Sequence, residues 1–445
     1  MLKNPVYYKT TQKCISDAYP LQEREELYLL VCAPVLISYV TWILSEVIKS
    51  GKQRLYFMAR DGYQMYVAAE YLCNAWNLNI ECRYLYVSRY AVRVPEYALL
   101  QEQCLERICV GGIDVTFHKI MRRAALTEEE SRQIASKIGY NGREEQILNY
   151  QQVLALKQTL KEQKDFFRYV YAHSVCAYDG VMAYFEQEGL LEQIDYALVD
   201  SGWIGTMQQS IENLLRTKQP ERCLEGYYFG MYECPAKANR KKYHSYYFSP
   251  EGSIYRKVYF SNSLFETIFS APHGMTIGYK KTGGKCKAIL DVALGYNEEN
   301  QKKSIELLKV YLQEYTKLVP EYEVVNGVGE KNRKLVENLL VLFMGRPSMY
   351  EVQAYGQDMF SDDVLEEEVK TVAAQLSGED IRNQRFWSKV CIMLGLKKGV
   401  IHESAWIEGS IVKNGKHVKG NLRHAAVYKY MLYLRKLLQQ KKRKA

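Results

Sequence analysis

Short apolar runs and longer segments with helical spacing alternate along the first two thirds of the chain. The runs lie at 55–58, within ECRYLYVSRY (81–90), at 195–199 and within CLEGYYFGMYE (223–233). Segments in which apolar residues recur every three to four positions separate them, as in amphipathic helices. Strands that alternate with helices predict a parallel sheet, so the expected fold class is α/β. The Tyr-rich stretch KKYHSYYFSP (241–250) predicts further strands and turns.

Two regions interrupt this alternation. Residues from about 95 to 191 are mostly helical in pattern and charged, and they are too many for an ordinary crossover. We therefore expect a large helical insertion or cap within an α/β core that spans 51–280. Residues 281–445 carry helical patterns and no confident series of strands, which predicts a helical C-terminal domain ending in a basic helix at 419–444. Residues 1–50 are expected to form a helical lead-in.

The most apolar segment, LYLLVCAPVLISYVTWIL at 27–44, carries no charge and reaches the minimum length of a membrane span. Pro34 and several Ser, Thr and Tyr residues lower its apolarity, so a helix buried against the sheet is favoured over a transmembrane helix. The first residues, MLKNPVYYKTTQK, are polar and do not resemble a cleavable signal peptide. The 11 cysteines are scattered, without CxxC or metal-ligand spacing, which indicates reduced thiols and a cytoplasmic location.

The net charge of +9 is compatible with an anionic ligand or an anionic membrane surface. Six basic residues and no acid lie in RKLLQQKKRKA (435–445), so two interpretations of this tail stay open: a solvated tail, and peripheral contact with the inner face of a membrane. No signature of RNA or DNA binding accompanies the charge, and nucleic acid is not an expected partner. The 38 tyrosines can stack on sugars or pack at core edges.

Polar side chains follow three of the predicted strands, at the edge where open α/β sheets bind ligands. ARDGY (59–63) follows the first strand, Ser88, Arg89 and Arg93 follow the second, and DSGWIGT (200–206) follows the third. Arginine binds phosphate through paired hydrogen bonds, and a Gly-rich turn at a helix start offers free N–H groups to an anion. Together the three strand ends predict a site for a ligand with several phosphates.

Each motif also has a structural alternative. Arg60 and Asp61 can satisfy each other as an ion pair, and DSGWIGT can be a tight strand-to-helix turn with Thr206 as the helix cap. A haloacid-dehalogenase hydrolase needs DxDxT or DxDxS after its first strand, whereas MARDGYQM has Ala59 where the nucleophilic Asp belongs. A GxSxG elbow and a P-loop are absent as well.

Six segments, in the same order, resemble the C-terminal module of large bacterial proteins from capsule and O-antigen gene clusters. In those proteins the module often follows a haloacid-dehalogenase phosphatase domain, which this sequence does not contain. The resemblance covers about 25–280, with a weaker likeness around 400–412. The segments are LYFMARDGYQMYVAAEYL, YLYVSRYAVR, ALVDSGWIGTMQQSI, LEGYYFG, FETIFSAPHGMTIGY and the late AWIEGSI.

The order of ARDGY, VSRY and DSGWIGT is also similar to type I phosphoribosyltransferases, which implies a phosphoribosyltransferase-like, Rossmann-like core. The resemblance implies that Arg60, Asp61 and Gly62 belong to the pyrophosphate loop, with Arg89 as the supporting base. It makes Asp200 the first acid of the ribose-binding pair and residues 202–206 the 5-phosphate cradle. This chain has Ser201 where the family has the second acid, and its turn is shorter than the usual TGGT loop.

The implied reaction is transfer of a phosphoribosyl group from phosphoribosyl pyrophosphate to a surface-polysaccharide acceptor, which can be lipid-linked. A separate phosphatase would remove the remaining 5-phosphate. Mg²⁺ is the implied cofactor, held by Asp61 and Asp200 directly or through water or substrate. The candidate bases are Asp61, Asp200 and Glu266, while His273 is either a catalytic or a loop histidine. The further candidate substrate contacts are Tyr63, Ser88, Arg93, Ser201, Gly202, Trp203, Gly205, Thr206 and His273.

Two other functions stay open. A dehalogenase-class hydrolase would use Asp61 as its nucleophile, although the first acid of that motif is missing. A non-catalytic adaptor would keep the fold and hold the glycan or a partner enzyme, and Ser201 in place of an acid is the residue that favours this alternative.

Overall fold

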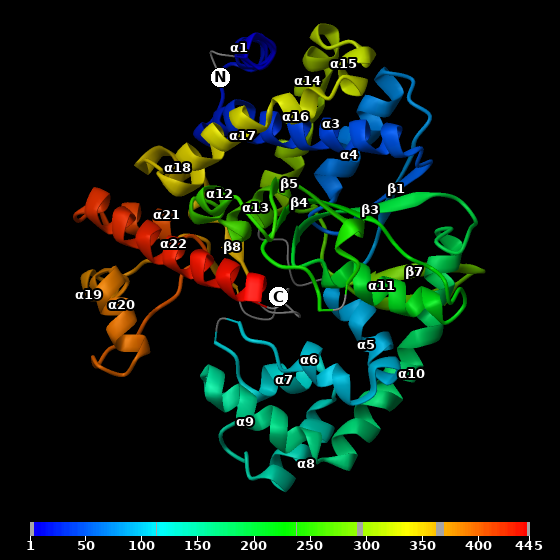
Figure 1. Cartoon of the computed structure of the whole chain (residues 1–445), viewed down its shortest axis with the longest axis vertical. Helices are drawn as coiled ribbons and strands as arrows, with labels where there is room; N and C mark the ends of the chain where they lie inside the picture. Colours follow the sequence, from blue (N-terminus) through cyan, green and yellow to red (C-terminus); the bar gives the residue numbers. More distant parts are fainter. Residues whose placement is uncertain (1–3, 113, 237, 292–296, 362–368, 443–445) are drawn as a thin grey trace.

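A five-stranded parallel sheet forms the centre of the molecule (Figure 1). The structure is a computed structural model that describes residues 4–112, 114–236, 238–291, 297–361 and 369–442. The strand order is β2-β1-β3-β4-β5, and all four pairings are parallel. The predicted α/β class is therefore confirmed. The strands are β1 (Arg54–Met58), β2 (Glu81–Leu85), β3 (Tyr196–Trp203), β4 (Gly226–Met231) and β5 (Tyr243–Phe248).

Helices cover both faces of this sheet, which explains why β1 and β4 are buried along their whole length. Leu55 and Phe57 of β1 pack on the side of α3 (Ala33–Ser50) and α4 (Tyr63–Ala75). The alternate residues of β1, Tyr56 and Met58, pack on the opposite side in one cluster with residues of α10 and α11. These helices span Lys164–Gln187 and Thr206–Arg216.

The apolar segment at 27–44 lies in this core. Within the described part of the chain, one helical stretch, Glu23–Ser50, is long and apolar enough to cross a membrane, and nearly all of its apolar window is buried in the fold. The stretch consists of α2 (Glu23–Leu27), a π-helical turn at Tyr28–Cys32, and α3. The predicted buried helix against the sheet is confirmed.

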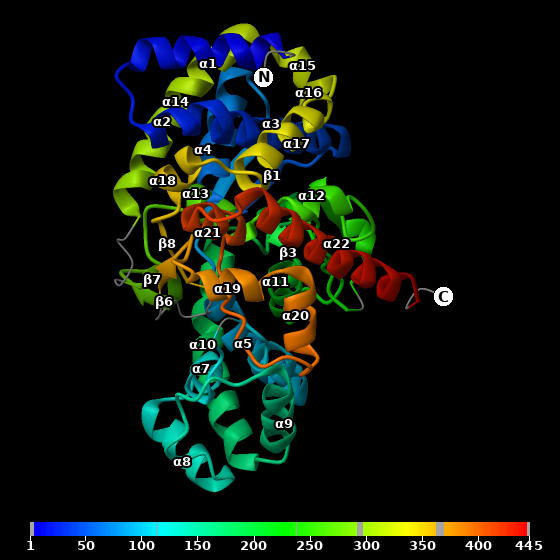
Figure 2. The same cartoon turned by 90° about the vertical axis from the view of Figure 1, so that its left-hand side faces the viewer.

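The described residues between β2 and β3 are mostly helical. Several of these helices share a hydrophobic core of their own, which includes Ile120, Leu156 and Phe166. The C-terminal half of α10 returns to the sheet through Val181 and Phe185. Figures 1 and 2 place α6–α9 at the end of the molecule opposite α1 (Pro5–Ala18). The helices are α5 (Arg89–Leu100), α6 (Leu105–Ile108), α7 (Phe117–Arg123), α8 (Glu128–Ile138), α9 (Tyr150–Lys161) and α10.

Helices α14–α18 pack on the N-terminal helices. The C-terminal part of the chain shares the large core beside the sheet through Leu308, Tyr311, Phe343 and Trp406 among others. The sequence predicted no strand series after 280, whereas β7, β8 and β9 are strands there. They form antiparallel pairs, β6 (Thr276–Thr282) with β7 (Lys285–Leu290) and β8 (Met359–Phe360) with β9 (Lys370–Thr371).

The bounds of the remaining helices complete the description. The predicted basic helix at 419–444 is α22 (Val418–Lys442), and residues 443–445 lie outside the described part. The others are α12 (Ile254–Val258), α13 (Asn262–Phe269), α14 (Glu298–Leu318), α15 (Glu321–Val325), α16 (Val328–Lys331), α17 (Arg333–Leu340), α18 (Met349–Tyr355), α19 (Gly378–Asn383), α20 (Phe386–Met393) and α21 (Ile407–Asn414).

Candidate functional site

A cavity of about 540 Å³ lies at the carboxyl ends of β1, β3 and β4. The chain passes from β1 to β2 on one side and returns to β3 on the other, so the direction of the strand order reverses between β1 and β3. Open parallel sheets bind ligands at such a reversal point, because the loops that follow the two strands diverge there. All three predicted strand-end motifs contribute to the cavity wall.

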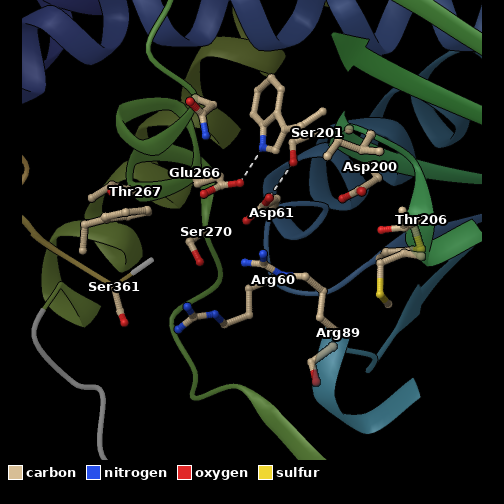
Figure 3. A pocket seen from close by; sticks show the side chains of 18 of the residues that line it. Arg60, Asp61, Arg89, Asp200, Ser201, Thr206, Glu266, Thr267, Ser270 and Ser361 are labelled. Carbon is tan, nitrogen blue, oxygen red and sulfur yellow. Dashed lines mark hydrogen bonds between the residues drawn. The ribbon is translucent and has the colours of Figure 1, made fainter. Parts of the chain in front are cut away.

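Four carboxyl groups line the cavity. Glu233 forms an ion pair with Lys436, and the other three come from three separate segments (Figure 3). Asp61 follows β1, Asp200 lies in β3, and Glu266 lies on α13. The Ser201 hydroxyl donates a hydrogen bond of 2.5 Å to Oδ2 of Asp61, and Nε1 of Trp203 donates to Oε1 of Glu266. The site therefore brings together all three predicted catalytic residues.

The carboxyl groups of Asp61, Asp200 and Glu266 interact electrostatically, and all three have raised pKa values. Burial is the largest cause of the raised pKa of Asp61, and the Ser201 hydrogen bond and the charges of Arg60 and Arg89 oppose it. Burial and then the negative charge of Asp61 raise the pKa of Asp200. The same two causes raise the pKa of Glu266. Burial thus disfavours the charged form of these acids, and a cation placed beside them would stabilise it.

Three arginines provide positive charge on the same cavity wall: Arg60, Arg89 and Arg93. Arg60 and Arg89 lie beside the carboxyl groups in Figure 3. Arg93 is almost fully buried, and its Nη2 donates to Oγ1 of Thr206 over 2.9 Å. Its Nε is buried and has no hydrogen-bond partner among the described residues. Burial lowers the pKa of Arg93 to about 10, so an anion placed here would stabilise its charged form.

The DSGWIGT turn has the backbone that its glycines indicate. Gly202 has φ of 113°, and a Cβ there would lie 2.4 Å from the carbonyl oxygen of Gly230 on β4. Gly205 is the N-cap of α11 with φ of 73°, and no side chain caps the first turn. The alternative with Thr206 as the cap is wrong, since Thr206 is the first helical residue and its hydroxyl accepts from Arg93. The N-terminus of α11 therefore keeps free N–H groups close to Arg93.

The structure places three of the predicted binding residues outside the cavity wall. Gly62 is the N-cap of α4, where a Cβ would lie 2.5 Å from the carbonyl oxygen of Met58. Tyr63 and His273 belong to an aromatic cluster with Tyr84, whose hydroxyl is 2.8 Å from Nε2 of His273. Burial lowers the pKa of His273. Their contacts are structural in this conformation.

The remaining predicted contacts line the cavity, although two have partners within the fold. Ser88 caps α5 and donates its hydroxyl to the carbonyl of Thr276 over 2.6 Å. Trp203 stacks on Phe248 while its indole N–H points to Glu266. The aromatic ring and the hydrogen bond together fix the Glu266 carboxyl at the cavity.

One wall of the cavity was not predicted from the sequence. It includes Leu432, Tyr433 and Lys436 of the basic helix α22. Tyr433 stacks on Tyr232 beyond the end of β4, with ring centroids 5.4 Å apart, and Lys436 forms an ion pair of 2.8 Å with Glu233. No known motif marks these residues. The sequence predicted a basic helix here, and the local signal for a second role was the YxxxLYxxK spacing at 428–436. The other unpredicted polar lining residues are Asn262, Thr267, Ser270, Asn297, Gln301 and Ser361.

The carboxylates of the cavity can be compared with the ligands that Mg²⁺ needs. Among the residues that the structure describes, no group of three or more His, Cys, Asp or Glu side chains can enclose a metal ion. Mg²⁺ is usually held in proteins by one or two carboxylates together with substrate phosphates and water. Asp61 and Asp200 fit this open arrangement, since both line the cavity and the charge of one raises the pKa of the other.

A scan against models of known protein families finds no match to the chain, and a search of curated proteins finds no significant similarity.

Proposed function

We propose that the protein is a glycosyltransferase that moves a phosphoribosyl group from phosphoribosyl pyrophosphate to a hydroxyl of a surface-polysaccharide acceptor. The observation that supports this most strongly is the convergence of three arginines and three carboxyl groups at the reversal point between β1 and β3. A donor with phosphate groups at both ends of a sugar needs cations at two places and acids between them. The phosphoribosyltransferase-like identity of the core is part of this proposal.

The two ends of the donor would bind at different strand ends. The 5-phosphate would bind at the N-terminus of α11, where uncapped N–H groups and Arg93 favour an anion. The pyrophosphate would bind at the turn after β1, beside Arg60 and Arg89. Asp200, between these positions, would accept hydrogen bonds from the ribose hydroxyls.

In the proposed reaction the bond between C1 and the pyrophosphate oxygen breaks, and an acceptor oxygen forms a bond to C1. Asp61 and Asp200 would hold Mg²⁺ together with the pyrophosphate, and the ion would supply positive charge for the leaving group. Arg60 and Arg89 hold the pyrophosphate by charge-assisted hydrogen bonds. A carboxylate accepts the proton of the attacking hydroxyl, and Glu266 is suited to this role because its raised pKa makes it a stronger base than an exposed glutamate.

The test is an assay with phosphoribosyl pyrophosphate, Mg²⁺ and candidate glycan acceptors, read by pyrophosphate release and by the mass of the acceptor. We expect one pentose phosphate to be added per acceptor, and we expect Arg60→Ala and Asp200→Asn to abolish the addition. Arg216→Ala and Asp165→Asn are matched controls, because each removes an ion pair on a helix surface outside the cavity wall.

The same assay separates the alternatives. Phosphate release from sugar phosphates that is lost in Asp61→Asn would identify a hydrolase instead. Binding of the donor or glycan in calorimetry, with no product from any acceptor, would identify a non-catalytic adaptor.

A further inference from the structure

An apolar surface on the outside of the C-terminal helices has no partner among the residues that the structure describes. Trp387 of α20 is 71% exposed, and Leu394 and Leu396, in the turn after α20, are 67% and 75% exposed. Met393 and Val400 are exposed as well. Single exposed apolar residues are normal on a protein surface, whereas five large ones within fourteen residues indicate an interaction site.

The neighbouring helix α22 presents one side to the cavity and another to solvent. Leu432, Tyr433 and Lys436 face the cavity. Val427, Met431 and Leu438 are exposed, and with Leu434 they follow a spacing of four, three and four residues. At about 100° per residue this spacing keeps them on one side of the helix, roughly opposite the cavity-facing residues.

The two exposed apolar groups adjoin each other. The hydroxyl of Tyr428 on α22 donates to Sδ of Met393 over 3.4 Å, and Nζ of Lys389 on α20 lies 4.6 Å from the centre of the Tyr428 ring. Figure 2 shows α20 beside α22 on the outside of the molecule. We call the following residues the apolar face, all of them exposed except the partly buried Leu434: Trp387, Met393, Leu394, Leu396, Val400, Val427, Met431, Leu434 and Leu438.

The charge around the apolar face is strongly positive. Residues 381–440 contain 12 Lys and Arg residues and two acids, Glu403 and Glu408. Both acids already have lysine partners, Lys389 at 3.2 Å and Lys429 at 2.7 Å. For the whole chain the count is 60 basic to 51 acidic residues, so this segment accounts for the net charge.

We propose that the apolar face is a docking surface for an anionic lipid bilayer. A basic helix with an apolar stripe lies in the interface, where its apolar side chains enter the headgroup region and its cations attract anionic lipids. The exposed tryptophan and leucines after α20 add apolar area next to that helix. This inference does not depend on the proposed activity. If both hold, α22 separates lipid headgroups from the cavity by the width of one helix, about 10 Å, within reach of a lipid-linked acceptor.

The test is flotation of the full-length protein with vesicles of phosphatidylglycerol and phosphatidylcholine, compared with phosphatidylcholine alone and without any substrate. We expect binding to the anionic vesicles, weaker binding in 0.5 M salt, and at least a tenfold lower partition constant for Leu394→Gln/Leu396→Gln and for Met431→Gln/Leu438→Gln. Ile147→Gln/Val175→Gln is the matched control, since it removes exposed apolar residues from the helical insertion. Thermal unfolding of each variant checks that it is folded.

A second readout follows Trp387. Vesicles should shift the tryptophan emission to shorter wavelength, and Trp387→Phe should remove this shift. Equal binding to both vesicle types, or equal loss in the control and the test variants, would overturn the proposal. So would a dimer in size-exclusion chromatography that the test variants dissociate, because a second copy would then cover the face.

Discussion

Ser201 on β3 donates its hydroxyl hydrogen to the carboxylate of Asp61 after β1, across the point where the strand order reverses. Type I phosphoribosyltransferases, which the motif order resembles, have an acid at the position of Ser201. An acid here would add a carboxyl group beside Asp61, whose negative charge already raises the pKa values of Asp200 and Glu266. A neutral donor instead lowers the pKa of Asp61 against the effect of burial. In this site Ser201 therefore favours the charged form of Asp61.

The first prediction concerns Ser201→Ala. Without its hydroxyl the pKa of Asp61 should rise further, because burial then has less opposition. If Asp61 acts in its charged form, the acid limb of the kcat/KM profile should move to higher pH, with a greater loss of activity at pH 6 than at pH 8. Ser270→Ala is the control, because Ser270 also lines the cavity. An acid limb that stays in place in Ser201→Ala would show that Asp61 does not limit the reaction.

The second prediction concerns stability and pH in the protein without ligand. Burial and the charge of Asp61 raise the pKa of Glu266, so the folded state holds this proton at pH values where the unfolded chain has released it. Stability should therefore fall as pH rises from about 4, the ordinary pKa of a carboxyl group, towards the raised pKa of Glu266. Glu266→Gln removes this dependence while Gln can still accept from Trp203.

Thermal unfolding between pH 5 and pH 8 measures the effect. The midpoint of the wild type should fall by at least about 2 °C more than that of Glu266→Gln. The exposed Glu129→Gln serves as the reference. Parallel curves for the wild type and Glu266→Gln would mean that Glu266 is charged throughout this range.

The residues at the carboxyl edge of the sheet could be predicted because strands and the turns after them are recognised from short stretches of sequence. An apolar run of four to eight residues indicates a strand, and parallel strands bring their carboxyl ends to one edge. Asp61, Arg89 and Asp200 could thus be assigned to one site without a known structure. Glu266 was placed there by resemblance, and its position is fixed by Trp203, a residue 63 positions away that no local pattern connects to it.

Two kinds of assignment could not be made from the sequence. Tyr63 and His273 adjoin motif residues in sequence, yet their side chains pack in an aromatic cluster with Tyr84. Side-chain direction depends on such tertiary packing. The wall formed by Tyr433 and Lys436 depends on where α22 crosses the cavity, which charge and helical spacing alone do not determine.

The third prediction concerns Arg93, a buried cation whose Nε has no hydrogen-bond partner among the described residues. Arg93→Met keeps an apolar stem and removes the buried charge, so the unliganded protein should be at least as stable as the wild type. The affinity for inorganic phosphate should fall by about 10- to 100-fold, as for loss of a charge-assisted hydrogen bond of about 1.5–3 kcal/mol. Calorimetry and thermal unfolding measure both quantities, and unchanged phosphate affinity would exclude Arg93 from the anion site.

The last prediction separates the backbone role of the DSGWIGT turn from its proposed ligand role. Gly202→Ala should destabilise the protein by about 3 kcal/mol or more, because a Cβ must adopt positive φ and also lies 2.4 Å from the Gly230 carbonyl oxygen. Gly51→Ala is the matched control: Gly51 also has positive φ, but nothing lies within 4 Å of a Cβ there. It should cost only about 1–2 kcal/mol in urea unfolding. Equal losses would mean that β3 and β4 can separate at Gly202, and the turn would then lack the rigidity that a preformed phosphate cradle requires.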